Sequence, residues 1–358
     1  MKKAYLVLAN GKVFEGKRFG ADTSVTGELV FTTGVVGYLE NLTDPCYYGQ
    51  IVLQTFPLIG NYGVIEEDIP ERASVAGYVV REWCDTPSNF RSQYDLDKYL
   101  KDQGIPGIYG IDTREVTRTI REDGVMAAMI CDEVPEDLSL LAAYQIENAV
   151  SAVTPIESAT LPAAGEELCH VTVLNYGSSA HIADALMAEG ATVTVLPYTA
   201  TAEEVLASAP DGIVLSEGPG DPNENTDAIE TVKALVGKAP LFGIGLGHQI
   251  LALAMGGKCE KMHHGHRGGN QPVRDLKGTR TYMTTQNHGY AVVADTVNAT
   301  EIYRNLNDGS CEGLCYYPEV PARSVQFTPV YANGPHDTSF LYTDFIQTVI
   351  KSKKAGEC

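Results

Sequence analysis

The stretch LFGIGLGHQILALAMGG, Leu241–Gly257, predicts a buried strand, a sharp turn and a helix. Its first apolar residues form a run of strand length, and the next ones recur at helical spacing. Gly243, Gly245 and Gly247 give the turn the G-x-nucleophile-x-G spacing of a nucleophile elbow, whose central residue carries the attacking side chain. Here the central residue is Gly245, which has no side chain. We therefore expect the backbone of a catalytic turn without its nucleophile.

The same rhythm extends on both sides of this turn. From His170 onward, apolar runs of strand length alternate with helical stretches. This alternation predicts βαβ crossovers and a doubly wound, mostly parallel sheet, whose functional loops lie at the carboxyl ends of the strands. The strand GIVLSEG leads into Gly218-Pro219-Gly220, where glycine lets the backbone approach a ligand closely. The N–H of Leu246, directly after the elbow, is placed where a backbone donor can stabilise an oxyanion.

The first half of the chain has a different pattern. Short apolar runs alternate with turn signals, starting with a hairpin around Asn10-Gly11, so this half should be rich in β-structure. Two helices are expected in DLDKYLKDQG and DTREVTRTIREDG. Residues 151–168 are small, polar and proline-containing, which is typical of a linker. We predict a β-rich α/β domain over residues 1–150, this linker, and a doubly wound domain over residues 169–358.

Length and charge exclude several classes of protein. A chain of 358 residues with 44% hydrophobic residues can form two domains, each with a buried core. The formal net charge of −20 disfavours nucleic acids and anionic membranes as partners. No apolar run approaches the roughly 20 residues of a membrane span. The N-terminal MKKAYLVLANGKVFEG has no cleavage site of a signal peptide. We expect a cytoplasmic protein that binds neither nucleic acid nor membrane.

Several ordered motifs resemble the small, glutamine-hydrolysing subunit family of carbamoyl phosphate synthetase, over essentially the whole chain. In the second half these are LSEGPGDP, FGIGLGHQILALAMGGK, GHRGGNQPV and QNHGYAV, which are similar to the class I glutamine amidotransferase domain. In the first half they are TGVVGYLENLTDP, IGNYG, SNFR and GIDTREVTRTIREDG. The resemblance implies a large-subunit partner that makes carbamoyl phosphate for pyrimidine or arginine biosynthesis. It also implies that ATP and metal belong to the large subunit and that this chain holds no cofactor.

The resemblance assigns three catalytic roles, and this sequence fills none of them. In the family a cysteine at the elbow attacks the glutamine amide, a histidine acts as base and a glutamate orients the histidine. The triad-equivalent positions are occupied by Gly245, Thr328 and Val330, aligned through ARSVQFTPVYANGPHD. Glycine offers no thiolate, threonine does not titrate near neutrality, and valine cannot hydrogen-bond an imidazole. No catalytic residue is intact, and the covalent route is predicted to be closed.

Around the lost triad, some positions depart from the family and others are retained. Glu217 stands where asparagine is usual, which adds negative charge beside the oxyanion loop, and Cys46 stands where serine is usual. Other positions match those that bind glutamine or its oxyanion in the family, so L-glutamine is a candidate ligand. These retained positions are Gly218, Gly220, Leu246, Gln249, Asn287, Gly289 and Tyr290.

Further residues invite functional interpretations that compete with structural ones. Cys46 could replace the nucleophile, but without a base to form its thiolate a buried thiol is the simpler interpretation. His336 could act as a base, whereas His248 and His288 are expected to be structural. MHHGHRGG contains three histidines, yet no neighbouring carboxylate completes a zinc site and the resemblance already explains the loop, so we predict no metal.

One helix carries a row of basic residues. Arg114, Arg118 and Arg121 share a face of the helix expected in DTREVTRTIREDG. The face is either solvated or in contact with a partner subunit.

Three functions follow from these observations. The first is a small subunit deficient in glutaminase activity, with a structural or allosteric role in an ammonia-dependent synthetase. The second is a pseudoenzyme that senses glutamine. The third is an amidase with a nucleophile foreign to the family.

Overall fold

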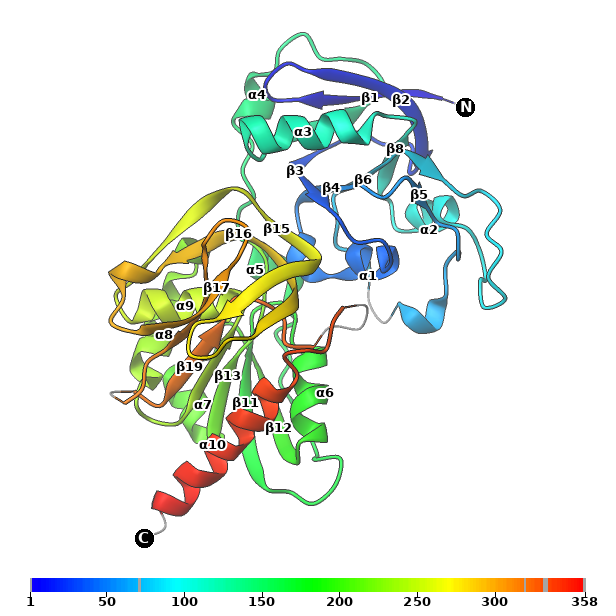
Figure 1. The fold of residues 1–358 in the computed structure, drawn as a ribbon. Helices are drawn as coiled ribbons and strands as arrows, with labels where there is room; N and C mark the ends of the chain where they lie inside the picture. The colour runs from blue at the N-terminus through cyan, green and yellow to red at the C-terminus, as the bar shows by residue number, and fades with distance from the viewer. Residues whose placement is uncertain (1, 70–71, 319, 331–333, 357–358) are drawn as a thin grey trace. The chain divides into compact units, whose positions relative to one another are not determined.

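The computed structural model describes residues 2–69, 72–318, 320–330 and 334–356, which form two units (Figure 1). The first unit comprises Met1–Glu147 with His263–Gly268, and the second comprises Asn148–Met262 with Gly269–Cys358. The first boundary between the units thus falls between residues 147 and 148, close to the boundary expected from the sequence.

The first unit is built on a closed β-barrel. Among the described residues its strand order is β1-β2-β8-β6-β4-β3-β9. Closure results because β1 pairs antiparallel with β2 on one side and with β9 on the other. The bounds are β1 Lys3–Leu8, β2 Val13–Gly20, β3 Val25–Thr32, β4 Gln50–Gln54, β6 Gly77–Val80, β8 Pro106–Tyr109 and β9 Met126–Cys131. The predicted hairpin is confirmed: β1 and β2 pair across a turn containing Gly11, at φ +86°.

Helices and short strands complete the first unit. Its longer helices, α2 (Leu96–Asp102) and α3 (Thr113–Asp123), are the two that the sequence predicts. Each begins at an aspartate, Asp95 and Asp112, whose side chain accepts a backbone N–H of the first turn. The remaining elements are α1 (Tyr38–Thr43), α4 (Ser139–Ala142), η1 (Pro45–Tyr47), η2 (Glu66–Asp68), and the paired strands β5 (Leu58–Ile59) and β7 (Glu82–Trp83).

The second unit contains the predicted doubly wound sheet. In the described part of the chain its ten strands have the order β10-β12-β11-β13-β14-β19-β18-β17-β15-β16. Strands β12, β11, β13, β14 and β19 are parallel neighbours, and an antiparallel extension follows from β19 onward. The bounds are β10 Ala159–Leu161, β11 Cys169–Asn175, β12 Ala191–Pro197, β13 Gly212–Leu215, β14 Leu241–Ile244, β15 Lys258–Asp275, β16 Thr281–Val293, β17 Thr300–Asn305, β18 Cys311–Cys315 and β19 Ala322–Val325.

Helices cover both faces of this sheet (Figure 1). Ile213 and Leu215 of β13 pack in the core under α7 (Ala202–Ala207), α8 (Thr226–Leu235) and α9 (Leu246–Ala254). Val214, between them, faces the core under α6 (Ala180–Ala188) and α10 (Phe340–Gly356). This alternation follows from the period of two along a strand, and it confirms the α/β prediction. The short elements are α5 (Ala149–Val153), η3 (Pro222–Glu224) and η4 (Ala294–Thr296).

The segment expected to be a linker is partly structured. Residues 151–168 include the end of α5 and all of β10, which pairs antiparallel with β12 through Thr160 and Thr194. β10 is a three-residue edge strand whose side chains are largely exposed, so its sequence is too short to show the pattern of a strand.

Within the described residues, no helix combines the length and the apolar character needed to cross a membrane.

Candidate functional site

The strand, turn and helix predicted from Leu241–Gly257 are confirmed as β14, Gly245 and α9. Gly245 has φ 56° and ψ −114°, a strained conformation that glycine tolerates and that is typical of a nucleophile elbow. The flanking glycines allow close packing. A Cβ atom on Gly243 would lie 2.6 Å from the carbonyl oxygen of Gly247, and one on Gly247 would lie 2.2 Å from that of Leu215. The turn therefore retains its full backbone geometry.

Glu217 faces this turn from the segment that follows the neighbouring strand, β13. It follows Ser216, which is fully buried and whose carbonyl accepts the N–H of Gly247 at 3.0 Å. The Ser216 hydroxyl donates to the carbonyl oxygen of Glu217 at 2.9 Å and accepts from the N–H of Tyr176 at 2.8 Å. The Ser178 N–H also donates to the Glu217 carbonyl, at 3.1 Å. The backbone of Glu217 is thus fixed at the carboxyl edge of the parallel sheet, where functional loops gather.

The side chain of Glu217 is buried between two polar partners. Thr328 donates a hydrogen bond from Oγ1 to Oε1 of Glu217. The Nε2 atom of His181 lies 3.0 Å from Oε2, within ion-pair distance. Glu217 is 7% exposed, and a buried carboxylate needs such partners to offset its loss of hydration. The three residues form a polar cluster, here called the Glu217 cluster.

The triad-equivalent positions lie partly in this cluster. Thr328 is buried, and its N–H bonds the Thr285 carbonyl oxygen at 3.0 Å. Its hydroxyl faces a carboxylate, which is a far weaker base than an alkoxide, so the bond orients this hydroxyl without ionising it. Val330 instead packs against the apolar core under α6 and α10. The arrangement supplies neither a thiolate at the elbow nor an imidazole at position 328.

Four of the seven retained pocket positions are brought together as two pairs. A Cβ atom on Gly218 would lie 2.9 Å from Cδ2 of Leu246, which places the loop after β13 against the start of α9. Gln249 donates from Nε2 to the carbonyl oxygen of Tyr290 at 2.8 Å and to Oε1 of Gln326 at 2.9 Å. Asn287 and Gly289 lie with Tyr290 on β16.

Gly220 belongs to a different hollow. It has φ +90° and lines a cavity of about 340 Å³ with Tyr198, Asp221 and the start of α8. This volume suits a small molecule.

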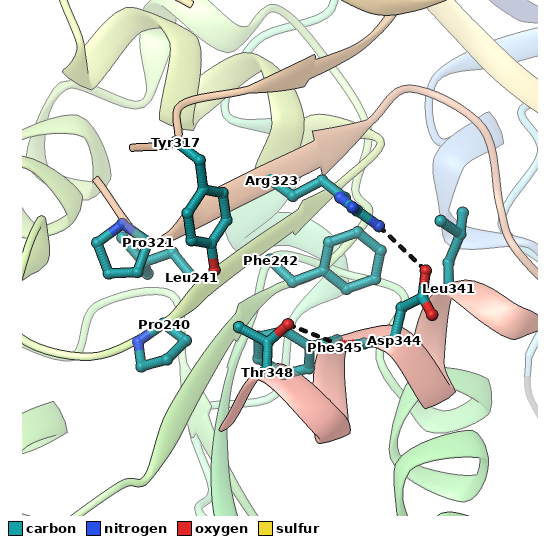
Figure 2. Close-up of a pocket in the computed structure, with 10 residues that line it drawn as sticks. All are labelled: Pro240, Leu241, Phe242, Tyr317, Pro321, Arg323, Leu341, Asp344, Phe345 and Thr348. Carbon is teal, nitrogen blue, oxygen red and sulfur yellow. Dashed lines mark hydrogen bonds and ion pairs between the residues drawn. The ribbon is translucent and has the colours of Figure 1, made fainter. Parts of the chain in front are cut away.

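A second crevice lies at the other end of the sheet (Figure 2). The crevice is lined at the amino end of β14 by Pro240, Leu241 and Phe242. It is also lined by Arg323 and Asp344, which form an ion pair with 3.4 Å between Nη1 and Oδ2. Its volume of about 30 Å³ is comparable to one water molecule, and it is too small for an amino acid. It is therefore unrelated to the elbow.

His248 and His288 are buried and make polar contacts, whereas His336 is exposed. His248 in α9 is fully buried, its Nδ1 lies 2.7 Å from Oγ of Ser324, and burial lowers its pKa to about 3. His288 lies with Nδ1 2.8 Å from the Tyr290 carbonyl oxygen and Nε2 3.1 Å from Oε1 of Gln286. These contacts support structural roles for both. His336 is exposed on the segment before α10.

Two histidines of MHHGHRGG contact backbone carbonyls. Nε2 of His263 lies 3.1 Å from the Arg121 carbonyl oxygen, and Nδ1 of His264 lies 2.8 Å from that of Gly265. Arg118, on the basic face of α3, forms an ion pair with Glu115, as expected for a solvated helix.

Cys46, considered above as a nucleophile, and Cys259, which follows α9, are both buried. Cys46, in η1, is 9% exposed, and its N–H donates to Oδ1 of Asp44 at 2.9 Å. An adjacent carboxylate is the opposite of the electropositive surroundings that activate a thiol. Burial raises the pKa of Cys259 to about 12, so its thiol is not ionised at neutral pH.

His181 is the site residue that the sequence analysis missed. It lies in the first turn of α6, which follows β11. Its position after the carboxyl end of a parallel strand was an available signal, but helix periodicity alone does not show that its ring points toward Glu217.

Two family models match this chain and define the class of protein to which it belongs. Residues 172–348 match the family described as glutamine amidotransferase class-I. Residues 6–130 match the carbamoyl-phosphate synthase small chain, CPSase domain. Together these matches cover both units of the chain.

Full-length relatives define the particular family. The carbamoyl phosphate synthase small chain of Bacillus caldolyticus is 44% identical over 363 residues, covering 99% of each chain. That of Fusobacterium nucleatum is 44% identical over 366 residues, covering 99% of this chain and 100% of the relative. The Listeria monocytogenes small chain is 42% identical over 362 residues, covering 100% and 99%. This chain belongs to the carbamoyl phosphate synthase small chain family.

Proposed function

We propose that the chain is the small subunit of an ammonia-dependent carbamoyl phosphate synthase and that it does not hydrolyse glutamine. The observation that carries this proposal is the elbow, which keeps its backbone geometry while Gly245 supplies no nucleophile. Thr328, in the place of the family's base, donates a hydrogen bond to Glu217. An amide entering this site would meet no thiolate at position 245 and no imidazole at position 328.

The partner in this proposal is a large subunit that binds ATP and metal and synthesises carbamoyl phosphate. The name "small chain" of the relatives supports such a partner. Since the chain contributes no ammonia, its role is structural or allosteric: it docks on the large subunit and supports synthesis from free ammonium. We place this ligase complex in the cytoplasm, in pyrimidine or arginine biosynthesis.

The test measures ammonia release from L-glutamine by the purified chain, alone and with a matching large subunit. The same mixtures are assayed for ammonium-driven carbamoyl phosphate synthesis. We expect no ammonia release above a protein-free blank, and faster synthesis with the chain than with the large subunit alone. A family member with a cysteine at the elbow is the positive control. Robust glutamine hydrolysis by this chain would contradict the proposal.

A glutamine-sensing subunit is the second candidate. It is favoured by the hydrogen bond from Gln249 to the Tyr290 carbonyl oxygen, which joins two retained pocket positions. In this version the chain binds glutamine without cleaving it and alters the activity of its partner. Calorimetric titration with millimolar L-glutamine separates the two candidates, because only a sensor gives a saturable binding heat.

A further inference from the structure

The space above the elbow is already occupied. In a G-x-nucleophile-x-G turn the central side chain projects from the strained residue. At Gly245 its first carbon would lie 2.8 Å from Cγ and 3.2 Å from Cβ of Glu217. The closer distance is well inside ordinary contact between carbon atoms, and interiors pack too tightly to absorb it without movement. A side chain at position 245 and the present placement of Glu217 therefore exclude each other.

Contacts at both ends hold Glu217 in this place. Its carbonyl oxygen accepts from Ser178 and Ser216, so the backbone cannot shift freely. Its carboxylate bonds Thr328, after β19, and lies beside His181, on α6. Turning the side chain away would break both carboxylate contacts and leave a buried charge without them, which is costly.

The carboxylate adds an electrostatic obstacle to the steric one. Amide hydrolysis at an elbow develops negative charge, first on the attacking thiolate and then on the oxyanion. A like charge nearby disfavours both species. Loss of the cysteine is thus not the sole barrier to amide chemistry at this turn.

We propose that Glu217 is a specificity-determining residue, which fills and negatively charges the place of the nucleophile so that the elbow rejects carboxamides even when a cysteine is restored. The proposal rests on the proposed loss of glutamine hydrolysis and extends it. It predicts that a side chain at position 245 becomes accessible when position 217 lacks a Cγ atom, because the closest contact is with Cγ of Glu217.

The test compares Gly245→Cys in the full chain with Gly245→Cys/Glu217→Ala, which removes the Cγ atom that would lie 2.8 Å from the new side chain. The probe is iodoacetamide, itself a small carboxamide, and the alkylated peptide is identified by mass spectrometry. Rates are compared on the plateau above the thiol pKa, so that ionisation of the thiol does not enter. We expect the introduced thiol to react about tenfold faster when Glu217 is replaced by alanine, because the probe can then reach the sulfur atom. Equal rates would overturn the proposal.

Two matched variants keep the test decisive. Gly245→Cys/Glu217→Gln retains the bulk of the side chain, and we expect its plateau rate to stay close to that of Gly245→Cys. A rate equal to that of the alanine variant would overturn the steric claim. If Gly245→Cys fails to fold, adding Glu217→Ala should restore folding, because it removes the clashing Cγ atom. Failure to restore it would show that backbone strain is the obstacle and would overturn the proposal.

This experiment is independent of the wild-type assay. Glutamine hydrolysis by the unmodified chain would contradict the proposed function, whatever the alkylation rates. Equal alkylation rates in an inactive chain would overturn only the role of Glu217.

Discussion

The Thr328 hydroxyl donates its hydrogen to the Glu217 carboxylate, joining the segment after β19 to the segment after β13. In the family's arrangement, the residue equivalent to Thr328 is a base that serves the nucleophile at the elbow. Here the two segments bind each other across Gly245. The polar groups that remain at the turn are thus engaged in holding the fold.

Removing this hydroxyl should destabilise the chain. Thr328→Val keeps the shape of the side chain but leaves a buried carboxylate without one donor, and hydrogen bonds to charged groups contribute about 1.5–3 kcal/mol. We expect a loss of this size in the free energy of unfolding, measured by urea titration. Thr328→Ser, which retains the hydroxyl, is the control and should lose less. A valine variant as stable as the wild type would show that the bond contributes nothing.

Gly247, in the first turn of α9, and Gly256, just beyond its end, should differ in their tolerance of alanine. A Cβ atom on Gly247 would meet the Leu215 carbonyl oxygen at 2.2 Å, whereas one on Gly256 would have no neighbour within 4 Å. Gly256→Ala therefore incurs the strain of φ +84° alone, about 1–2 kcal/mol. Gly247→Ala must displace backbone and should cost about 3 kcal/mol or more. Thermal unfolding of the two variants checks this order, and a reversed order would refute the packing argument.

His248 should make stability sensitive to acid. Burial lowers its pKa in the folded chain to about 3 from 6.5, so below pH 6.5 the unfolded chain binds a proton that the folded chain does not. Stability is therefore retained above pH 6.5 and is lost progressively as the pH falls toward 3. Between pH 7 and pH 5 this group alone should remove about 2 kcal/mol.

The control for this pH dependence is His248→Asn. It offers a polar atom near the position of Nδ1, which contacts Ser324, but does not titrate. The difference in unfolding free energy between the wild type and the variant should shrink by about 2 kcal/mol from pH 7 to pH 5, measured by chemical denaturation. A difference independent of pH would mean that this histidine is protonated equally in both states.

Cys259 should resist alkylation in the native chain. Burial raises its pKa to about 12, so at pH 8 only about one thiol in ten thousand is ionised. Cys84 is partly exposed and serves as the internal comparison. Peptide mapping after brief iodoacetamide treatment should find Cys84 modified and Cys259 unmodified until denaturant is added. Early modification of Cys259 would contradict its burial.

Local patterns predicted the elements that depend on local chemistry. The strand, turn and helix around Gly245 follow from glycine spacing and periodicity, and the parallel sheet follows from alternating strands and helices. Closure of the barrel was not predicted, because it depends on pairing between β1 and β9, which lie far apart in sequence. β10 was assigned to a linker because a strand of three residues is too short to carry a periodic signal.

The sequence predicted which residues stand at the candidate site, but not the directions of their side chains. Residue identities at the elbow showed which groups are lost, and Glu217 was recognised as a charge beside the oxyanion loop. Its direction was not predictable, because it is set by contacts with His181 and Thr328 on separate elements. Tertiary packing, which the sequence pattern does not encode, decides whether such a charge faces solvent or the turn.

The short strand β10 also limits how the second unit can be produced alone. Its pairing with β12 covers one margin of the sheet, where unsatisfied N–H and C=O groups would otherwise recruit strands from other molecules. A truncation that begins at Cys169 would remove this cover and favour aggregation. Beginning the truncated chain at Asn148 would keep the margin protected and leave α5 in place.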